Sequence, residues 1–429
     1  MGLCIGCGTC FSICPYSAVS IVKDDKNSTY KPIISESCKE CRLCVEACFG
    51  IGVDPKLSLE IFDKGFEGPF LGTFRNCYVG HACDHEIRYN SASGGIVTAL
   101  LLYMLEEKLV DGVLVTKMDQ KRPLDPKPFI AKTASEVISA ARSKYCPLPA
   151  NVALKAIMKE NGRYAVVGLP CHIYGIRKAE SIYPDLANKI LFHIGIFCGG
   201  TPNFLATEYL LRRLRVRKEE ITNMEYRGEG WPGKMLIELK GTNENERNRL
   251  LLPYPDYWRG LSSFFLPYRC ILCADGLNKF ADISCGDAWL PEYQSNNLGL
   301  SLIMTRNEIG EGLVSGAREK RRVQLETVEF SRIKQAEKSM ILFKTVNLRA
   351  RTRLLKTLGK PLPACDNTDT KVLQPKLTNY LGSVLFFLLR FVALNRSMWN
   401  LLDIYQVLQK SDGRLKHALK MLGSRLKIL

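Results

Sequence analysis

The sequence predicts an α+β protein: a small cysteine-rich domain, then an α/β core with a mainly parallel sheet, then a helical basic tail. Three observations point to this fold class. Residues 1–50 hold eight cysteines at regular spacing, strand-like apolar runs alternate with helical patterns from about residue 76 to 330, and the last 99 residues are rich in Lys and Arg. The 46% hydrophobic and 24% charged shares are typical of globular proteins, which excludes a disordered or collagen-like chain.

The cysteine-rich domain, residues 1–55, contains one cysteine pattern twice. Cys4-x2-Cys7-x2-Cys10-x3-Cys14-Pro15 is repeated as Cys38-x2-Cys41-x2-Cys44-x3-Cys48. This is the spacing of bacterial ferredoxins with two [4Fe-4S] clusters, in which the fourth cysteine of each run binds the other cluster. We therefore assign Cys4, Cys7, Cys10 and Cys48 to one cluster, and Cys38, Cys41, Cys44 and Cys14 to the second.

Zinc is the alternative for these eight cysteines. Zinc ribbons use two separated pairs rather than runs of three plus one, so the spacing favours iron–sulfur clusters.

Two departures from the ferredoxin pattern are present. Phe49 stands where proline is usual, and only three residues precede Cys4. Either the domain lacks its usual first strand or the start of the protein lies further upstream.

Residues 56–75 are rich in Gly and Pro and predict a linker. Beyond it, residues 96–108 show helical periodicity after two glycines. Buried strands are predicted at 110–116, 164–168, 190–197, 235–239 and 300–305. Because helix-length segments separate these strands, we expect βαβ units and a largely parallel sheet.

The cellular setting follows from what this sequence lacks. It shows no signal-peptide pattern after Met1, so we expect a cytoplasmic protein with reduced thiols. We find no run of about 18 apolar residues, and the best candidate, 381–394, contains Arg390.

Two clusters pass electrons singly and cannot accept a hydride, so the core should hold a flavin or a similar cofactor.

A series of short motifs in the core occurs in a fixed order. They are Arg88-Tyr-Asn-Ser-Ala-Ser-Gly-Gly95 with Thr98, Asp111-Gly-Val-Leu-Val-Thr116, Ser143-Lys-Tyr145, Val167-Gly-Leu-Pro-Cys-His172, Phe197-Cys198, Arg227-Gly-Glu-Gly-Trp-Pro-Gly233, Cys270-x2-Cys273-x-Asp275, Ala281-Asp-Ile-Ser-Cys-Gly-Asp-Ala-Trp289 and Gly299-Leu-Ser301 with Arg306. Together they resemble the coenzyme F420 hydrogenase/dehydrogenase beta-subunit family over roughly residues 1–310. The resemblance divides the core into an N-terminal part, 76–155, and a C-terminal part, 156–330.

The resemblance implies an FAD-containing oxidoreductase that exchanges a hydride with coenzyme F420, its substrate. Its [4Fe-4S] clusters would pass single electrons to or from ferredoxin or a partner oxidoreductase subunit. Two alternatives stay open. One is a ferredoxin-dependent reductase of another small molecule, for example in polysaccharide metabolism. The other is a non-catalytic electron-relay subunit.

Candidate cofactor contacts lie at the predicted helix start and at one strand end. Two glycines that open a helix allow backbone amides to approach a phosphate, although close packing explains them equally well. Strand carboxyl ends are where α/β proteins bind ligands. The residues at these two places are Ser93, Gly94, Gly95, Thr98, Gly168 and Pro170.

Charged candidates are fewer. Lys144 and Arg227 would bind the flavin or an anionic substrate, unless they are simply solvated. Asp287 would orient the flavin or bind substrate, unless it only caps a turn. His172 is the one imidazole placed to contact flavin or substrate, with a structural role as the alternative. We expect no catalytic dyad, because hydride transfer needs orientation more than a strong acid or base.

Four more cysteines form a candidate third [4Fe-4S] site: Cys171, Cys198, Cys270 and Cys273, with Cys285 as a substitute ligand. The family contains members with a cluster in this core. The alternative is that these are buried, reduced cysteines that pack as small apolar side chains. Cys77, Cys83, Cys146 and Cys365 have no partner spacing, and we expect structural roles for them.

The tail, residues 331–429, carries 19 Lys and Arg against five Asp and Glu, whereas the first 330 residues have a net charge of only +3. Residues 384–389 and 391–394 are apolar. A basic amphipathic helix is predicted around Leu415, Leu419, Leu422 and Leu426, with Arg414, Lys416, Lys420, Arg425 and Lys427. Three interpretations remain: packing against the body or a partner subunit, contact with the cytoplasmic membrane surface, and nucleic-acid binding. We expect no nucleic acid, because aromatic platforms and nucleic-acid motifs are absent from the tail sequence.

Overall fold

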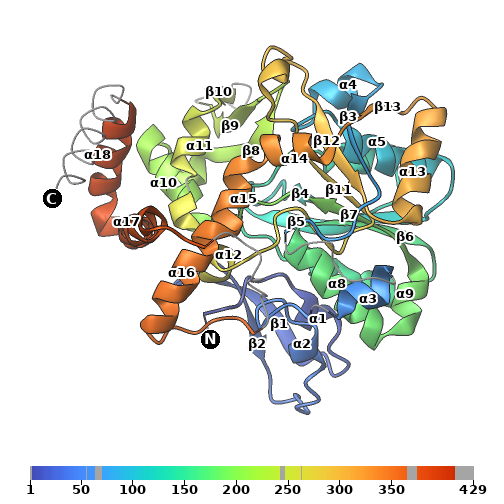
Figure 1. The fold of residues 1–429 in the computed structure, drawn as a ribbon, viewed down its shortest axis with the longest axis horizontal. Helices are drawn as coiled ribbons and strands as arrows, with labels where there is room; N and C mark the ends of the chain where they lie inside the picture. Colours follow the sequence, from blue (N-terminus) through green and yellow to red (C-terminus); the bar gives the residue numbers. More distant parts are fainter. Residues whose placement is uncertain are drawn as a thin grey trace.

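The protein is described here by a computed structural model (Figure 1) that covers residues 2–54, 56–62, 70–241, 247–261, 263–364 and 374–410. Cys365 and the basic helix expected around residues 414–427 lie outside the described residues.

The N-terminal domain is ferredoxin-like. A β-hairpin of β1 (Val19–Asp24) and β2 (Thr29–Ile34) separates two cysteine loops, each followed by a one-turn helix, α1 (Thr9–Ser12) or α2 (Leu43–Glu46). Gly6 and Gly8 have φ of 70° and 90°, a left-handed conformation that glycine adopts without steric cost, and this lets the first loop turn tightly. In the described residues no strand precedes Cys4.

The core is built on an eight-stranded mixed sheet with the order β13-β3-β12-β11-β7-β6-β4-β5. Its strands are β3 (Asn76–Ala82), β4 (Gly112–Met118), β5 (Pro126–Ala131), β6 (Tyr164–Gly168), β7 (Ile190–Ile196), β11 (Ile283–Asp287), β12 (Ser301–Thr305) and β13 (Val323–Thr327). Four of the five predicted strands, at 110–116, 164–168, 190–197 and 300–305, therefore lie in this sheet.

The prediction of a mainly parallel sheet is wrong outside the four central strands. Only β4, β6, β7 and β11 run parallel. β5 follows β4 after a turn closed by a hydrogen bond from the Asp119 amide to the Asp125 carbonyl (2.8 Å), too short for the crossover that a parallel return requires. On the other side, α13 (Glu308–Glu319) links β12 to β13, and β3 lies between them, antiparallel to both.

The strand predicted at 235–239 exists but belongs elsewhere. It is β9 (Lys234–Lys240), the middle strand of a separate antiparallel sheet with β8 (Ile221–Gly228) and β10 (Arg247–Pro253). The connection between β8 and β9 is a five-residue turn, which allows only a hairpin. This sheet packs against α10 (Phe204–Leu214) and α18 (Trp399–Lys410).

The large sheet buries both faces, which explains its nearly continuous apolar strands. On one face, α5 (Ile96–Glu106) and α13 pack over Val113 and Val115 of β4. On the other, α7 (Leu154–Lys159) and α8 (Pro170–Ile182) pack over Leu114, together with Ile13 and Phe49 of the N-terminal domain. Figure 1 shows that domain below the sheet, beside α8.

Other short helices are α3 (Leu57–Phe62), α4 (His85–Tyr89), α6 (Ala134–Ser139), α9 (Pro184–Lys189), α11 (Asp256–Gly260) and α12 (Tyr268–Ile271). The described part of the tail is helical: α14 (Phe330–Ala336), α15 (Lys338–Lys344), α16 (Val346–Thr357), α17 (Leu377–Leu394) and α18. In the described residues, α17 is the one helix long and apolar enough to cross a membrane by length and composition. Residues of α16 and α17 pack against α12.

Candidate functional site

The structure gathers the eight N-terminal cysteines into the two sets that the spacing predicted. Burial and, after it, the charge of Cys48 raise the pKa of the Cys7 thiol to about 12, so Cys48 has crossed to the first loop. Burial likewise raises the pKa of Cys44, followed by the charges of Cys14, Cys41 and Cys38. The charge of Cys44 also raises the pKa of Cys10, which shows that the two sets are neighbours.

The surroundings of these thiols suit iron–sulfur clusters. Backbone amides of Gly6 and Ala18 donate to the sulfurs of Cys4 (3.4 Å) and Cys14 (3.3 Å), as expected for ligands that carry charge. Among the described residues, no group of three or more His, Cys, Asp or Glu side chains is arranged to hold a single metal ion. The thiolates of a cubane stand farther apart than the ligands of one ion, because each binds a different iron.

A further set of four cysteines lies in the core, as predicted. Cys171 lies in the first turn of α8, Cys198 follows β7, and Cys270 and Cys273 lie in and just after α12. Burial raises the pKa of Cys171 far above its usual range, and the charges of Cys198, Cys7, Cys270 and Cys273 add to this effect. The core set therefore adjoins the first N-terminal set through Cys7.

Cys285, the predicted substitute ligand, does not join this set. Burial alone raises its pKa to about 12, without a contribution from another cysteine.

Lys344 of α15 is buried against the core set, with its Nζ 3.5 Å from the carbonyl oxygen of Cys273. Burial lowers the pKa of Lys344, but the charges of Cys273, Cys198 and Cys270 outweigh burial and raise it. Among the described residues, no carboxylate forms an ion pair with this ammonium group. An anionic cluster held by the core set would supply the missing counter-charge.

A cavity of about 770 Å³ opens at the carboxyl ends of β4, β6, β7 and β11. Its size falls in the range typical of cofactor sites, and its position is the one at which α/β sheets bind ligands. Cys198 lies in its wall, so the cavity and the core set share a boundary. Of the predicted contacts, Ser93, Gly95, Thr98, Lys144, Gly168, His172, Arg227 and Asp287 line the cavity, whereas Gly94 and Pro170 do not.

At the start of α5, some residues pack against neighbouring strands and others line the cavity. The Ser93 hydroxyl donates to the carbonyl of Leu300 (2.7 Å), and the Gly94 amide donates to the Ser301 hydroxyl (3.0 Å). A Cβ atom on Gly94 would lie 2.6 Å from the Gly80 carbonyl oxygen, so glycine is required there for close packing. Gly95, with φ of 79°, and Thr98 are left at the cavity wall.

Comparison with known proteins decides the family. The model for the N-terminal part of the coenzyme F420 hydrogenase/dehydrogenase beta subunit matches residues 77–155, and the model for its C terminus matches residues 161–330. The chain belongs to this beta-subunit family. A 4Fe-4S dicluster domain also matches, at residues 3–49, so this family member carries iron–sulfur clusters.

Individual relatives agree with that assignment. The coenzyme F420 hydrogenase subunit beta of Methanosarcina barkeri is 29% identical over 266 residues, which is 58% of this chain and 81% of the relative. The coenzyme F420-dependent sulfite reductase of Methanocaldococcus jannaschii is 25% identical over 344 residues, 76% of this chain but only 48% of the relative. One chain of the solved F420-reducing [NiFe] hydrogenase complex from Methanosarcina barkeri shares the fold, with a TM-score of 0.53, 23% identity, and coverage of 69% of this chain and 98% of that chain.

In this beta-subunit family member, Arg227 and Asp287 form a pair, so neither is the independent contact that the sequence suggested. Two guanidinium nitrogens of Arg227 donate to the two carboxylate oxygens of Asp287, each at 2.8 Å. Trp231 adds a third donor at 3.0 Å. Burial lowers the pKa of Arg227, but the Asp287 carboxylate outweighs burial and raises it.

Lys144 and His172 are also held by backbone groups. The Lys144 ammonium donates to the carbonyls of Ala141 (2.7 Å) and Arg142 (2.9 Å), and burial lowers its pKa to about 7. His172 accepts from the Leu169 amide (3.2 Å), and its other ring nitrogen lies 3.1 Å from the Leu148 carbonyl oxygen. Burial lowers the pKa of His172 to about 4. With both nitrogens occupied, the structure favours its structural role.

Sequence reasoning missed the aromatic wall of the cavity. Tyr145, Tyr254, Trp258 and Trp289 come from three distant segments and line the cavity together. Tyr145 and Trp258 meet edge to face with ring centroids 5.0 Å apart, and Tyr254 lies 5.3 Å from Trp289. Tyr145 and Trp289 stood inside the family-like motifs, but nothing in their spacing indicated that they meet.

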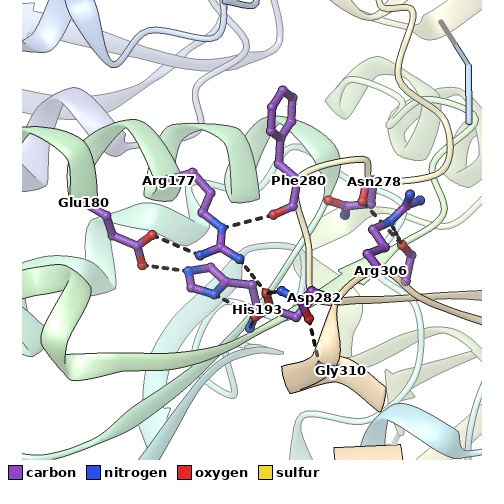
Figure 2. A network of polar contacts seen from close by, with 10 residues as sticks. Arg177, Glu180, His193, Asn278, Phe280, Asp282, Arg306 and Gly310 are labelled. Atoms are coloured by element: carbon purple, nitrogen blue, oxygen red, sulfur yellow. Dashed lines mark hydrogen bonds and ion pairs between the residues drawn. The ribbon is translucent and has the colours of Figure 1, made fainter. Parts of the chain in front are cut away.

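A buried charged network was missed as well (Figure 2). His193 of β7 lies between Glu180 of α8 (2.7 Å) and Asp282 (3.1 Å), and Arg177 of α8 pairs with Asp282 at 2.7 Å. Burial and the Arg177 charge lower the pKa of His193, but the two carboxylates outweigh them and raise it. The network fixes α8, whose first turn contains Cys171, to the sheet.

Proposed function

We propose that this chain is an iron–sulfur flavoprotein that exchanges a hydride between coenzyme F420 and FAD and passes single electrons to or from a redox partner. The observation that carries this proposal is the position of the core cysteine set. Through Cys171 the set adjoins Cys7 of the N-terminal domain, and through Cys198 it reaches the cavity wall. A cluster there would complete a path from the N-terminal clusters to the cavity.

The cavity suits FAD in both size and lining. Gly95 and Thr98 at the start of α5 would face a phosphate or ribose, where helix amides favour negative charge. The aromatic wall offers flat surfaces for a ring system, and the Arg227–Asp287 pair gives it a polar edge. When bound, FAD supplies the conversion between a hydride and single electrons.

Glu337 would handle the proton that accompanies a hydride. It lies at the cavity wall, and burial, followed by the Asp287 charge, raises its pKa to about 8. At neutral pH its carboxyl group therefore holds a proton that it can release. Glu337 lies beyond the family matches, which end at residue 330.

The second N-terminal set, with exposed Cys41, would be the entry for the one-electron partner. Relatives are named as subunits of larger enzymes, which supports a partner oxidoreductase subunit in that place.

The test is an anaerobic preparation of the full chain with its cofactors. We expect bound FAD that reduced F420 bleaches, and about twelve irons per chain, four for each of three clusters. Cys171→Ser should lower iron to about eight and slow electron delivery to the N-terminal clusters, while F420 still reduces the flavin. Cys83→Ser, at an exposed cysteine outside all three sets, is the matched control and should change neither.

Two results would replace the proposal. Flavin that ferredoxin reduces but reduced F420 leaves unchanged would indicate a reductase of another small molecule. A preparation with full iron content but no flavin would indicate a relay subunit.

A further inference from the structure

The outward face of α17 is a line of exposed apolar side chains. Leu377, Leu381, Leu385, Leu388 and Phe391, here called the apolar stripe, recur every three or four residues and are each 50–72% exposed. The most apolar 18-residue window of this helix is only 11% buried. Leu401 and Ile404 of α18 extend the exposed apolar surface, at 52% and 57%. Apolar surface of this extent usually marks an interaction site.

The opposite face of these helices is attached to the protein. Arg390, on α17, donates to the carbonyls of Phe264 and Leu266, and Ser383 and Ala393 are buried. Asp403, on α18, pairs with Arg212 of α10 at 3.0 Å. Crossing a bilayer would break these bonds and carry the Arg390 charge into hydrocarbon, so α17 is placed to lie on a surface rather than to span it.

The charge around the apolar stripe has one sign. Residues 374–402 contain no Asp or Glu. Lys356, Lys360 and Lys376 are exposed on the neighbouring segments. The single acidic residue of α18, Asp403, is already paired. Basic residues close to an anionic membrane surface are attracted to it.

We propose that the apolar stripe docks this protein on an anionic phospholipid bilayer surface. An aliphatic row along a helix with basic flanks is the pattern of interfacial helices, which bury their apolar face at the headgroup boundary. The centres of protein–protein interfaces are instead enriched in aromatic residues, Met and Arg, whereas four of the five stripe residues are leucines.

Vesicle flotation tests this docking. We expect the full chain to float with vesicles of phosphatidylcholine and phosphatidylglycerol, and less with phosphatidylcholine alone. Leu385→Ser/Leu388→Ser should reduce partitioning about tenfold or more, because each buried leucine contributes about 1.5 kcal/mol or more. The control is Ile309→Ser on α13, which is 51% exposed and lies at the other side of the molecule (Figure 1).

Iron content and the thermal unfolding midpoint establish that each variant is folded. Two outcomes overturn the proposal: a parent chain that floats with neither vesicle, or a double variant that floats as well as its parent. If light scattering instead shows a dimer that the double variant dissociates, without vesicle binding, the stripe binds a second copy of this chain.

Discussion

At the scale of single residues, two kinds of buried ionisable group bear on the candidate site. Arg227 with Asp287, and His193 with its two carboxylates, are paired and hydrogen-bonded, so burial of their charge is compensated. Glu337 and Lys344 form no ion pair among the described residues. Both belong to the tail, and both point to the proposed cofactor region: the cavity for Glu337 and the core cysteine set for Lys344.

Glu337 should make stability depend on pH. Its pKa rises from an ordinary 4.5 to about 8 on folding, so the folded state keeps a proton that the unfolded state loses. Stability is then full below pH 4.5 and falls as pH rises through 8. Glu337→Gln never ionises, so at pH 9 its free energy of unfolding should exceed that of the parent by on the order of 1–3 kcal/mol. At pH 4 the two proteins should unfold at nearly the same urea concentration.

Urea midpoints at the two pH values provide the measurement. Glu319→Gln, at an exposed glutamate of α13, is the control and should shift both midpoints equally. An equal shift at both pH values for Glu337→Gln would show that the carboxyl group ionises normally.

At the scale of elements, local patterns predicted five of the thirteen strands in the described residues and the helix at α5. Strand β6 is found at the predicted residues, because a run such as Tyr164–Gly168 is apolar throughout and only a doubly covered strand buries all of it. Strand direction could not be predicted in this way. β9 has the same local pattern, but the short turn before it places it in a hairpin of the smaller sheet.

Helix α15 is an element whose role the sequence did not indicate. It lies beyond the family matches. In the sequence, Lys344 cannot be told apart from the other lysines of the basic tail, but in the structure it is buried beside Cys273. The tail therefore contributes to the core and is more than an appended basic segment.

Lys344→Met should lower the midpoint potential of the proposed core cluster, because the reduced cluster carries the larger negative charge and loses a nearby cation. Lys344→Arg keeps the charge and should stay near the parent value. Redox titration followed by electron paramagnetic resonance measures both, with iron content as the check on cluster assembly. Equal potentials in the parent and Lys344→Met would remove Lys344 from this role.

At the scale of the whole molecule, the N-terminal domain is closely seated on the core. The Asn151 side-chain amide donates to the Thr9 hydroxyl (2.8 Å) and to the His172 carbonyl (3.0 Å), and the Asn151 backbone amide donates to the Cys7 carbonyl (3.0 Å). A Cβ atom on Gly175 of α8 would lie 2.3 Å from the Thr9 hydroxyl. This seating holds Cys7 near Cys171.

Gly175→Ala should therefore push the domain outward. We expect a loss of roughly 1–3 kcal/mol in the free energy of unfolding and slower electron transfer between the N-terminal and core clusters. Gly312→Ala on α13 has open space around its new Cβ atom and should instead stabilise the chain by about 1 kcal/mol. Urea unfolding and rapid-mixing absorbance measure the two effects. A gain in stability at both positions would contradict this account of the seating.

The cysteine sets of the candidate site could be predicted from sequence, whereas its cavity wall could not. Ligand cysteines follow a spacing that cluster geometry imposes, and Cys171, Cys198, Cys270 and Cys273 are recognisable by residue type. Arg227 and Asp287 are 60 residues apart, and nothing local indicates that they pair. The same holds for the aromatic wall and for His193, because their meeting depends on how distant strands align.

Strand β3 carries a consequence for how this chain is made. Its residues, 76–82, are synthesised early, whereas its two partners, β12 and β13, lie more than 200 residues downstream. A ribosome delivers the N-terminal part first, so both edges of β3 stay unpaired until β12 has emerged, and one edge until residue 327 of β13 has emerged. Until then its edges are open to other chains, and a nascent protein cut short after β11 lacks the two strands that join β3 to the large sheet.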